Sequence, residues 1–139
     1  LPTWQFVLSH GDMLCTDDKD YQSFRSQVRD PAWRTAFLHK PLQERKVIAA
    51  RLREQSENAK REKLNQAQQY QMDLNPGATD DFLRNHGYAT FIHGHTHRPA
   101  THDLFVDGIH VERWVMADWS ADRGEYLTWN DTELSRQSI

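Results

Sequence analysis

The sequence predicts a mixed α/β fold on the strength of three observations. A short apolar strand over residues 4–9 runs directly into His10-Gly11-Asp12. The stretch from about Glu44 to Leu74 contains good helix formers and no Gly or Pro. A second short strand over residues 88–93 leads into a histidine-rich loop, and Asp107-Gly108 beyond it is a strong hairpin signal. The expected class is therefore α/β, with strands that deliver histidine-bearing loops.

Helices are expected between the two strands. Thr16 or Asp17 is placed to cap a helix that begins near Asp18. Pro31 and Pro41 then divide the next segment into two or three short helices, because proline cannot continue a helix from within. The long helix from residue 44 follows.

The end of the long helix is predicted at Asn75-Pro76-Gly77. A shorter helix is expected over about residues 79–85, with Gly87 beyond its end.

The last part of the chain reads as β structure. Residues 103–106 and 109–116 flank the Asp-Gly pair, which tolerates the positive φ angles of a type I′ turn. Residues 126–129 are predicted to form a last strand, followed by a polar tail.

Composition and charge narrow the range of functions. A chain of 139 residues is one domain by length, or a piece of one. A single cysteine, Cys15, excludes an internal disulfide, and no apolar run approaches the roughly 20 residues that cross a bilayer. The net charge of −3 argues against a general nucleic-acid binder. Leu1 to Trp4 carry neither an initiator Met nor a signal-peptide pattern, so we expect the chain to begin inside a longer protein.

One segment is strongly basic within this acidic chain. Residues 25–53 contain eight Lys and Arg residues against two acidic ones. Such a block suggests an anionic partner, either a phosphate-bearing ligand or a lipid surface.

The histidines give the sharpest functional signal. His95 and His97 follow a strand directly, and in an extended backbone residues i and i+2 point the same way. His10 also follows a short apolar strand, and each site has a glycine beside the histidine, Gly11 or Gly94. Because ligands collect beyond the carboxyl ends of strands in an α/β sheet, we expect one shared metal site. Imidazole suits several transition metals, so the spacing does not name the ion.

These motifs resemble the last two blocks of the calcineurin-like metallophosphoesterases. The resemblance is closest to the branch of lipid A biosynthesis that acts on UDP-2,3-diacylglucosamine, and it runs from about residue 4 to residue 119. The similar segments are His10-Gly11-Asp12 with Leu14-Cys15-Thr16-Asp17-Asp18, Tyr21-Gln22, Phe24-Arg25, Ile48-Ala49-Ala50-Arg51, Met72-Asp73, Ile92-His93-Gly94-His95-Thr96-His97-Arg98-Pro99 and Ala117-Asp118-Trp119.

The resemblance implies the C-terminal half of a metallophosphoesterase β-sandwich flanked by helices. It implies a partial domain over residues 1–139, with a helical lid inserted at about residues 18–75. It also implies two Mn²⁺ ions, with His10 and His95 on one and His97 on the other. The remaining ligands of that family come from Asp-x-His, Gly-Asp-x-x-Asp and Gly-Asn-Arg-Asp blocks, which this sequence does not contain. The chain alone is therefore expected to be inactive.

The resemblance also implies substrate-binding residues, namely Asp18, Ser56, Lys60, Lys63 and His95. Ser56, Lys60 and Lys63 lie at i, i+4 and i+7, on one face of a helix. From spacing alone, a solvated charged face is the favoured interpretation of these three. Lys60 departs from the family, whose members carry Asn at this position.

An apolar and basic patch is expected in the same region. Trp33, Phe37, Leu38 and Leu42 lie among the basic residues of the segment 25–53. Packing between lid helices and an acyl-chain groove that contacts the anionic inner leaflet both explain this patch, and the sequence leaves both open.

The function implied by the resemblance is hydrolysis of the diphosphate of UDP-2,3-diacylglucosamine by a water activated by two metals. The products would be UMP and lipid X. The reaction would take place on the cytoplasmic side of the inner membrane. Another phosphoesterase acting on nucleotides or phosphoproteins is one alternative, and a non-catalytic metal-binding module is a second. A nucleic-acid binder is disfavoured because the basic segment contains no recognition motif.

Overall fold

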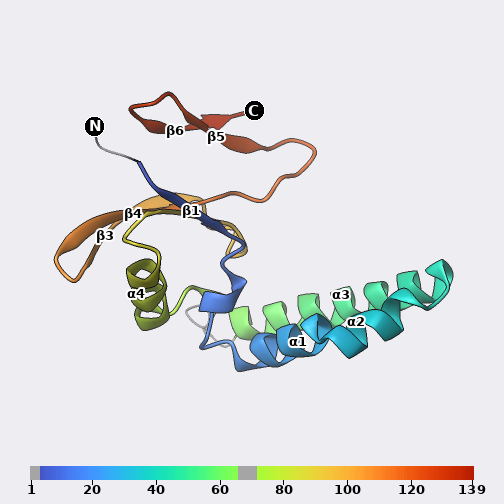
Figure 1. The fold of residues 1–139 in the computed structure, drawn as a ribbon. Helices are drawn as coiled ribbons and strands as arrows, with labels where there is room; N and C mark the ends of the chain where they lie inside the picture. The colour runs from blue at the N-terminus through green and yellow to red at the C-terminus, as the bar shows by residue number, and fades with distance from the viewer. Residues whose placement is uncertain (1–3, 66–71) are drawn as a thin grey trace. The chain divides into compact units, whose positions relative to one another are not determined.

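The computed structural model describes residues 4–65 and 72–139 (Figure 1). Its elements are β1 (Phe6–Ser9), the 3₁₀ helix η1 (Asp12–Leu14), α1 (Lys19–Arg29), α2 (Pro31–Leu38), α3 (Leu42–Asn65), α4 (Pro76–Asn85), β2 (Thr90–His93), β3 (Ala100–Val106), β4 (Ile109–Val115), β5 (Glu125–Trp129) and β6 (Leu134–Ser138). These elements confirm the predicted α/β class. None of the described helices is both long enough and apolar enough to span a bilayer.

The chain divides into two compact units. The first, called here the sheet unit, comprises Leu1–Leu14 and Leu74–Ile139, and the second, the helical unit, comprises Cys15–Asp73. The helical unit covers nearly the same residues as the predicted insertion at about 18–75, of which residues 66–71 lie outside the described part of the chain.

A four-stranded sheet with the order β1-β2-β4-β3 forms the centre of the sheet unit. β1 pairs in parallel with β2, and β2 in parallel with β4, whereas β3 and β4 form an antiparallel hairpin. α4 lies on one face of this sheet and the β5–β6 hairpin on the other (Figure 1). Because β1 and β2 run in the same direction, the loops that follow them leave the sheet at the same edge.

The core of the sheet unit lies between α4 and the sheet. Leu83 of α4 and Phe91 of β2 are fully buried, and the ring of Phe82 lies 5.0 Å from that of Phe91 between centroids. Val111 and Val115 of β4 complete this layer. The core fixes β2, and with it the start of the histidine loop.

The predicted turn between β3 and β4 is confirmed, and α4 holds it in place. Asp107 and Gly108 have φ angles of 53° and 79°, as a type I′ turn requires. Arg84 donates from Nε to Asp107 at 2.7 Å and from Nη2 at 3.0 Å, and the hydroxyl of Tyr88 donates at 2.9 Å. The Arg84 guanidinium, followed by the Tyr88 hydroxyl, lowers the pKa of Asp107 to about 2.

The N-cap of α1, the first helix of the helical unit, lies one residue later than Asp17, the later of the two predicted positions. Asp18, rather than Thr16 or Asp17, caps α1, because its side chain accepts a hydrogen bond from the Tyr21 backbone N–H at 3.1 Å. The prolines act as predicted: α2 begins at Pro31, and α3 begins directly after Pro41.

The predicted end of the long helix is wrong, and so is the start of the next one. Residues 72–74 are not α-helical, while the helix predicted from residue 79 already begins at Pro76. Asn75 accepts from the Ala78 N–H at 3.0 Å and Pro76 occupies the first helical position. Asn-Pro is therefore a helix start here, because a proline at that position loses no helical hydrogen bond.

Two β elements also differ from the prediction. β2 begins at Thr90 rather than residue 88, because Gly87 and Tyr88 have left-handed φ angles of 66° and 58°. The polar tail contains a strand, β6, which pairs antiparallel with β5. Asn130 builds the turn between them, since its side chain accepts from the Glu133 N–H at 2.8 Å.

Candidate metal site and substrate residues

The loops after β1 and β2 bring two of the predicted ligand histidines together. Ser9 and His93 pair at the ends of these parallel strands, and the Gly94 N–H donates to the His10 carbonyl at 3.2 Å. The rings of His10 and His95 then lie 5.0 Å apart between centroids, at an interplanar angle of 71°. Two imidazoles from distant parts of the sequence thus meet at one edge of the sheet.

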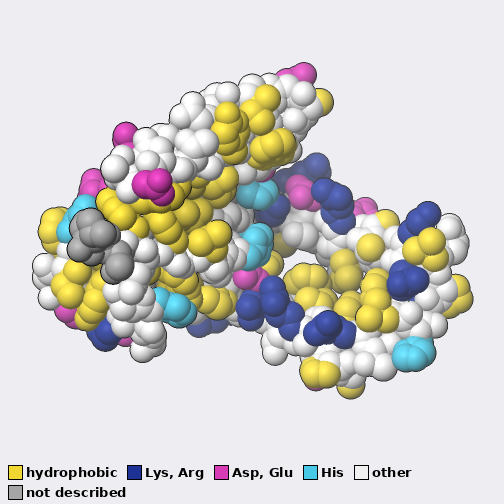
Figure 2. Space-filling view, turned by 45° about the horizontal axis from the view of Figure 1, so that its top comes forward, with side chains coloured by type: hydrophobic (Ala, Val, Ile, Leu, Met, Phe, Trp, Pro, Cys, Tyr) yellow, Lys and Arg dark blue, Asp and Glu magenta, His cyan; other side chains and the backbone are white. Residues whose placement is uncertain are grey.

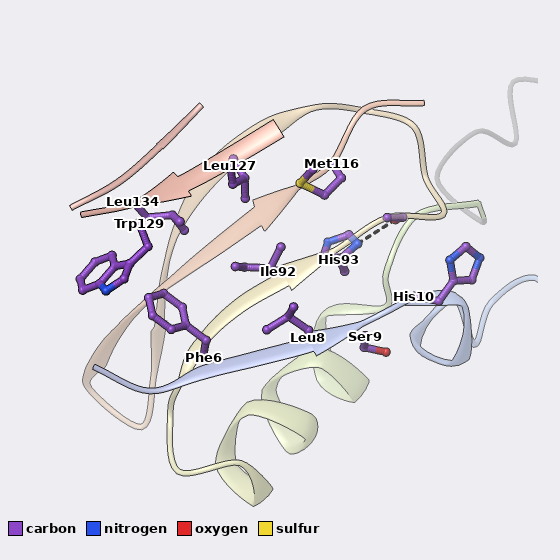
Figure 3. A pocket seen from close by; sticks show the side chains of 11 residues that line it. Phe6, Leu8, Ser9, His10, Ile92, His93, Met116, Leu127, Trp129 and Leu134 are labelled. Atoms are coloured by element: carbon purple, nitrogen blue, oxygen red, sulfur yellow. Dashed lines mark hydrogen bonds between the residues drawn. The ribbon is translucent and has the colours of Figure 1, made fainter. Parts of the chain in front are cut away.

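Gly11 allows this approach of the two loops. Its φ angle is +92°, and a Cβ atom at this position would lie 2.9 Å from Nδ1 of His93. The His93 ring is buried at the end of β2, and its Nδ1 lies 2.9 Å from the Gly94 carbonyl oxygen (Figure 3). His93 therefore forms part of the packing beneath the loops, and only glycine fits against it.

The expected extended backbone at His95 and His97 is wrong. Both residues have left-handed φ angles, 65° and 53°, and the Thr96 N–H turns back to the Gly94 carbonyl at 2.8 Å. The loop is a bend, so strand alternation does not set the directions of the two rings. Left-handed φ angles at non-glycine residues cost energy and concentrate at functional sites, which makes this bend a notable feature of the candidate site.

His97 lies beside a carboxylate to which the sequence pattern gives no role. Its Nδ1 is 4.0 Å from Oδ2 of Asp118, in the loop after β4. Asp118 belongs to one of the segments that carry the family resemblance, but no sequence pattern predicts that it lies beside His97. A second unassigned carboxylate, Asp12 of the His-Gly-Asp segment, is 3% exposed.

The histidines do not amount to a complete metal shell. Within residues 4–65 and 72–139, no three His, Cys, Asp or Glu side chains lie close enough together to hold a metal ion. The donor types of His10 and His95 fit a divalent transition metal, because neutral imidazole is a ligand common to these ions. Two adjacent dications would need anionic ligands in addition.

An open apolar pocket lies next to His10, on the face of the sheet opposite α4. It has a volume of about 680 Å³ and is lined by residues of β1, β2 and the β5–β6 hairpin (Figure 3). Leu8, Ile92 and Leu127 contribute to its walls, and His10 and His93 stand at one end. Leu8 is 71% exposed, so part of the apolar lining on this side is open to solvent.

The predicted substrate residues of the helical unit fall into two groups. Asp18 and Lys63 form an ion pair with each other, and their side chains are only 11% and 12% exposed. Ser56 and Lys60 are exposed on α3, and Lys60 contacts Glu57 at 3.5 Å. The predicted helix over these positions is confirmed, while Lys63 takes part in packing that Ser56 and Lys60 do not share.

The helical unit leaves much apolar surface uncovered. α1 and α2 contain no buried residue, and Leu38, Leu42 and Val47 are each more than half exposed. Figure 2 shows hydrophobic side chains close to Lys and Arg side chains on this unit. Of the apolar residues in the patch expected from the sequence, Leu38 and Leu42 are therefore at the surface. Trp33 and Phe37 are half-buried, and their rings stack on each other at 5.1 Å between centroids.

The chain is similar to curated UDP-2,3-diacylglucosamine hydrolases over most of its length. The enzyme of Aromatoleum aromaticum is 57% identical over 124 residues, which cover 89% of this chain and 49% of the relative. The enzymes of Bordetella pertussis and Chromobacterium violaceum are each 45% identical, over 87% and 91% of this chain and 45% and 51% of the relatives. The chain thus spans about half the length of the curated relatives it matches. No protein-family model matches it. These similarities confirm the resemblance inferred from the histidine motifs.

Proposed function

We propose that this chain is part of a UDP-2,3-diacylglucosamine hydrolase, the activity for which the similar proteins are named. The parent enzyme would hydrolyse the diphosphate bond of UDP-2,3-diacylglucosamine and release UMP and 2,3-diacylglucosamine 1-phosphate. The observation that carries this proposal is 57% identity over 89% of the chain. The approach of His10 and His95 supports it independently, because it places two metal-ligand side chains at the end of the sheet.

The parent would complete the fold on the face of the sheet opposite α4. Phe6, Leu8 and Ile92 line the pocket on that face, and burial of apolar surface contributes about 25 cal/mol per Å². The part of the parent that this chain does not span, about half by comparison with the relatives, would supply a second sheet and form a β-sandwich. The same part would supply the carboxylate ligands.

The proposed metal ligands are His10 and His95 on one ion and His97 on a second, with Mn²⁺ as the proposed metal. The 5.0 Å between the rings of His10 and His95 is a spacing at which two imidazoles can share an ion. When bound, the two ions would activate water and neutralise charge on the phosphoryl oxygens. This chain's contribution is to hold the imidazoles through the β1–β2 pairing and the Gly11–His93 packing.

The proposed substrate residues are Asp18, Ser56, Lys60 and Lys63, in a helical lid over about residues 18–75, together with His95. The Asp18 carboxylate fixes the ammonium group of Lys63, and both are largely removed from solvent. Ser56 and Lys60 offer an exposed hydroxyl and ammonium group on α3. Such groups can bind the phosphate and hydroxyl oxygens of a sugar nucleotide.

The apolar and basic patch of the helical unit supports a location at a lipid surface. Exposed Leu38 and Leu42 would contact acyl chains, and exposed cations of the same basic segment, such as Lys46, would attract anionic headgroups. We therefore propose that the parent acts in the cytoplasm, as a peripheral protein on the inner membrane.

The test is Mn²⁺-dependent release of UMP from UDP-2,3-diacylglucosamine by the parent protein. The wild type should turn over, whereas His10→Ala and His95→Ala should lose most activity. His110→Ala is the matched control, since this histidine is exposed on β4 and pairs with Asp103. Turnover on simple nucleotides or phosphoproteins in place of the diacyl sugar nucleotide would favour the other phosphoesterases. Binding of Mn²⁺ without any turnover would favour a non-catalytic module.

A further inference from the structure

Asp118 lies in the loop between β4 and β5 of the sheet unit. Its two carboxylate oxygens face different partners. Oδ1 accepts a hydrogen bond from Nη2 of Arg123 at 2.5 Å, and Oδ2 faces Nδ1 of His97 at 4.0 Å. The carboxylate is 39% exposed and the histidine 53%, so both lie at the surface where a second ligand could reach the ring.

The position of Asp118 is fixed from both sides along the chain. The Ala117 N–H donates to Oε1 of Glu125 at 2.8 Å, and Nε1 of Trp119 donates to the Glu125 carbonyl at 3.0 Å. Glu125 itself is buried and pairs with Arg136. Ala117 and Trp119, the two chain neighbours of Asp118, are therefore both hydrogen-bonded to the buried Glu125. These bonds leave Asp118 little freedom to move.

The loop that follows β2 and carries His97 begins beside the loop that follows β4 and carries Asp118. The Met116 N–H donates to the His93 carbonyl at 2.7 Å, and His93 pairs with Val115 across the parallel strands β2 and β4. The two loops thus leave neighbouring strands at the same edge of the sheet. The approach of Asp118 to His97 follows from this pairing and is not a chance meeting of long side chains.

We propose that Asp118 is a positioning residue for His97, held in place by Arg123. A carboxylate at Nδ1 selects the tautomer that carries the proton on this nitrogen and leaves Nε2 to face a metal ion. The 4.0 Å separation is longer than a hydrogen bond, and the proposal requires a rotation of the exposed His97 ring that closes it. This proposal rests on the proposed function, in which His97 is a metal ligand.

The test reads the tautomer of His97 in the metal-free chain 1–139. Ring nitrogens of ¹⁵N-labelled histidine are observed by NMR at a pH where the imidazoles are neutral. The same spectrum contains internal references. Nδ1 of His39 and of His86 each lie 2.7 Å from a backbone carbonyl, which requires the Nδ1–H form, and Nε2 of His110 lies 2.7 Å from Asp103.

The wild type should show His97 mainly as the Nδ1–H tautomer, matching His39 and His86. Asp118→Ala should shift His97 towards the Nε2–H form, and Arg123→Ala should shift it part of the way. Asp103→Ala is the matched control and should alter His110 alone. Dispersed amide spectra show that each variant folds. A His97 that is mainly Nε2–H in the wild type, or that is unchanged in Asp118→Ala, would overturn the proposal.

A second readout uses the parent enzyme and Mn²⁺ as the probe. Loss of an outer-shell partner typically lowers metal affinity by about 10- to 100-fold. Asp118→Ala should weaken Mn²⁺ binding by this factor, as measured by calorimetry, and unchanged affinity would contradict the proposal. If the parent fails to hydrolyse the sugar nucleotide while the tautomer result holds, the proposed function falls and the Asp118–His97 contact stands.

Discussion

Gly11 lies against the buried ring of His93, so closely that a single added carbon atom would collide with it. A Cβ atom would come within 2.9 Å of the ring nitrogen Nδ1, and the φ angle of +92° is already one that L residues rarely adopt. The glycine of the His-Gly-Asp segment is thus explained by packing and backbone conformation together.

Gly11→Ala should destabilise the chain by roughly 2–5 kcal/mol, the sum of left-handed strain and overpacking. Gly108→Ala is the matched control, because Gly108 also has a positive φ of 79° but nothing lies within 4 Å of its would-be Cβ. This control should cost only roughly 1–2 kcal/mol. Urea unfolding of both variants measures the difference. Equal costs would show that the contact with His93 contributes nothing.

Asp107 gives a prediction of pH dependence. Its pKa is lowered from 3.8 to about 2 in the folded chain, chiefly by Arg84. A lowered folded-state pKa means that the contact stabilises the fold fully above about pH 4 and is lost as the pH falls through 2. In Asp107→Asn the loss of stability between pH 4 and 2 should therefore be smaller than in the wild type.

Denaturant unfolding across this pH range measures the effect. Asp131→Asn is the control, since Asp131 is another left-handed turn residue, with a φ of 71°. An identical pH profile for the wild type and Asp107→Asn would contradict the prediction.

Asp18 is predicted to act twice in the helical unit, as the cap of α1 and as the partner of Lys63. Asp18→Ala should cost about 0.5–2 kcal/mol for the cap and a further 1–3 kcal/mol for the stranded, largely buried ammonium group. Asp30→Ala is the matched control, because it removes only the cap of α2. The Asp30 side chain accepts a hydrogen bond from the Trp33 N–H on an exposed surface.

The comparison of these two variants by thermal or urea unfolding isolates the ion pair. Asp18→Asn should keep the cap and lose the charge pair, so it should cost less than Asp18→Ala by about the value of the cap, roughly 0.5–2 kcal/mol. If Asp18→Ala and Asp30→Ala cost the same, the pair with Lys63 does not stabilise the helical unit.

The strand-and-loop framework of the site could be predicted from local sequence. Short apolar strands before His10 and before His95 are strong local signals, and parallel pairing then places their ends together. The Asp107-Gly108 turn could also be predicted from the sequence, because few other residue pairs accept two positive φ angles.

The remaining features depend on tertiary contacts or on competing local rules. Asn75-Pro76 is a turn signal and also a helix start, and only the side-chain bond from Asn75 to the Ala78 N–H decides between them. β6 is polar and exists through its pairing with β5, so its pattern gave no signal. The Asp118–His97 contact joins loops of two strands and could not be read from spacing.

A titration of the ¹⁵N-histidine-labelled chain with Zn²⁺ tests whether His10 and His95 belong to one metal site. The ring signals of His10 and His95 should shift together with one midpoint, and His10→Ala should remove the response of His95. His110, which pairs with Asp103, should not respond at the same concentrations. If the His95 ring responds to Zn²⁺ with an unchanged midpoint in His10→Ala, the two histidines do not share a metal ion.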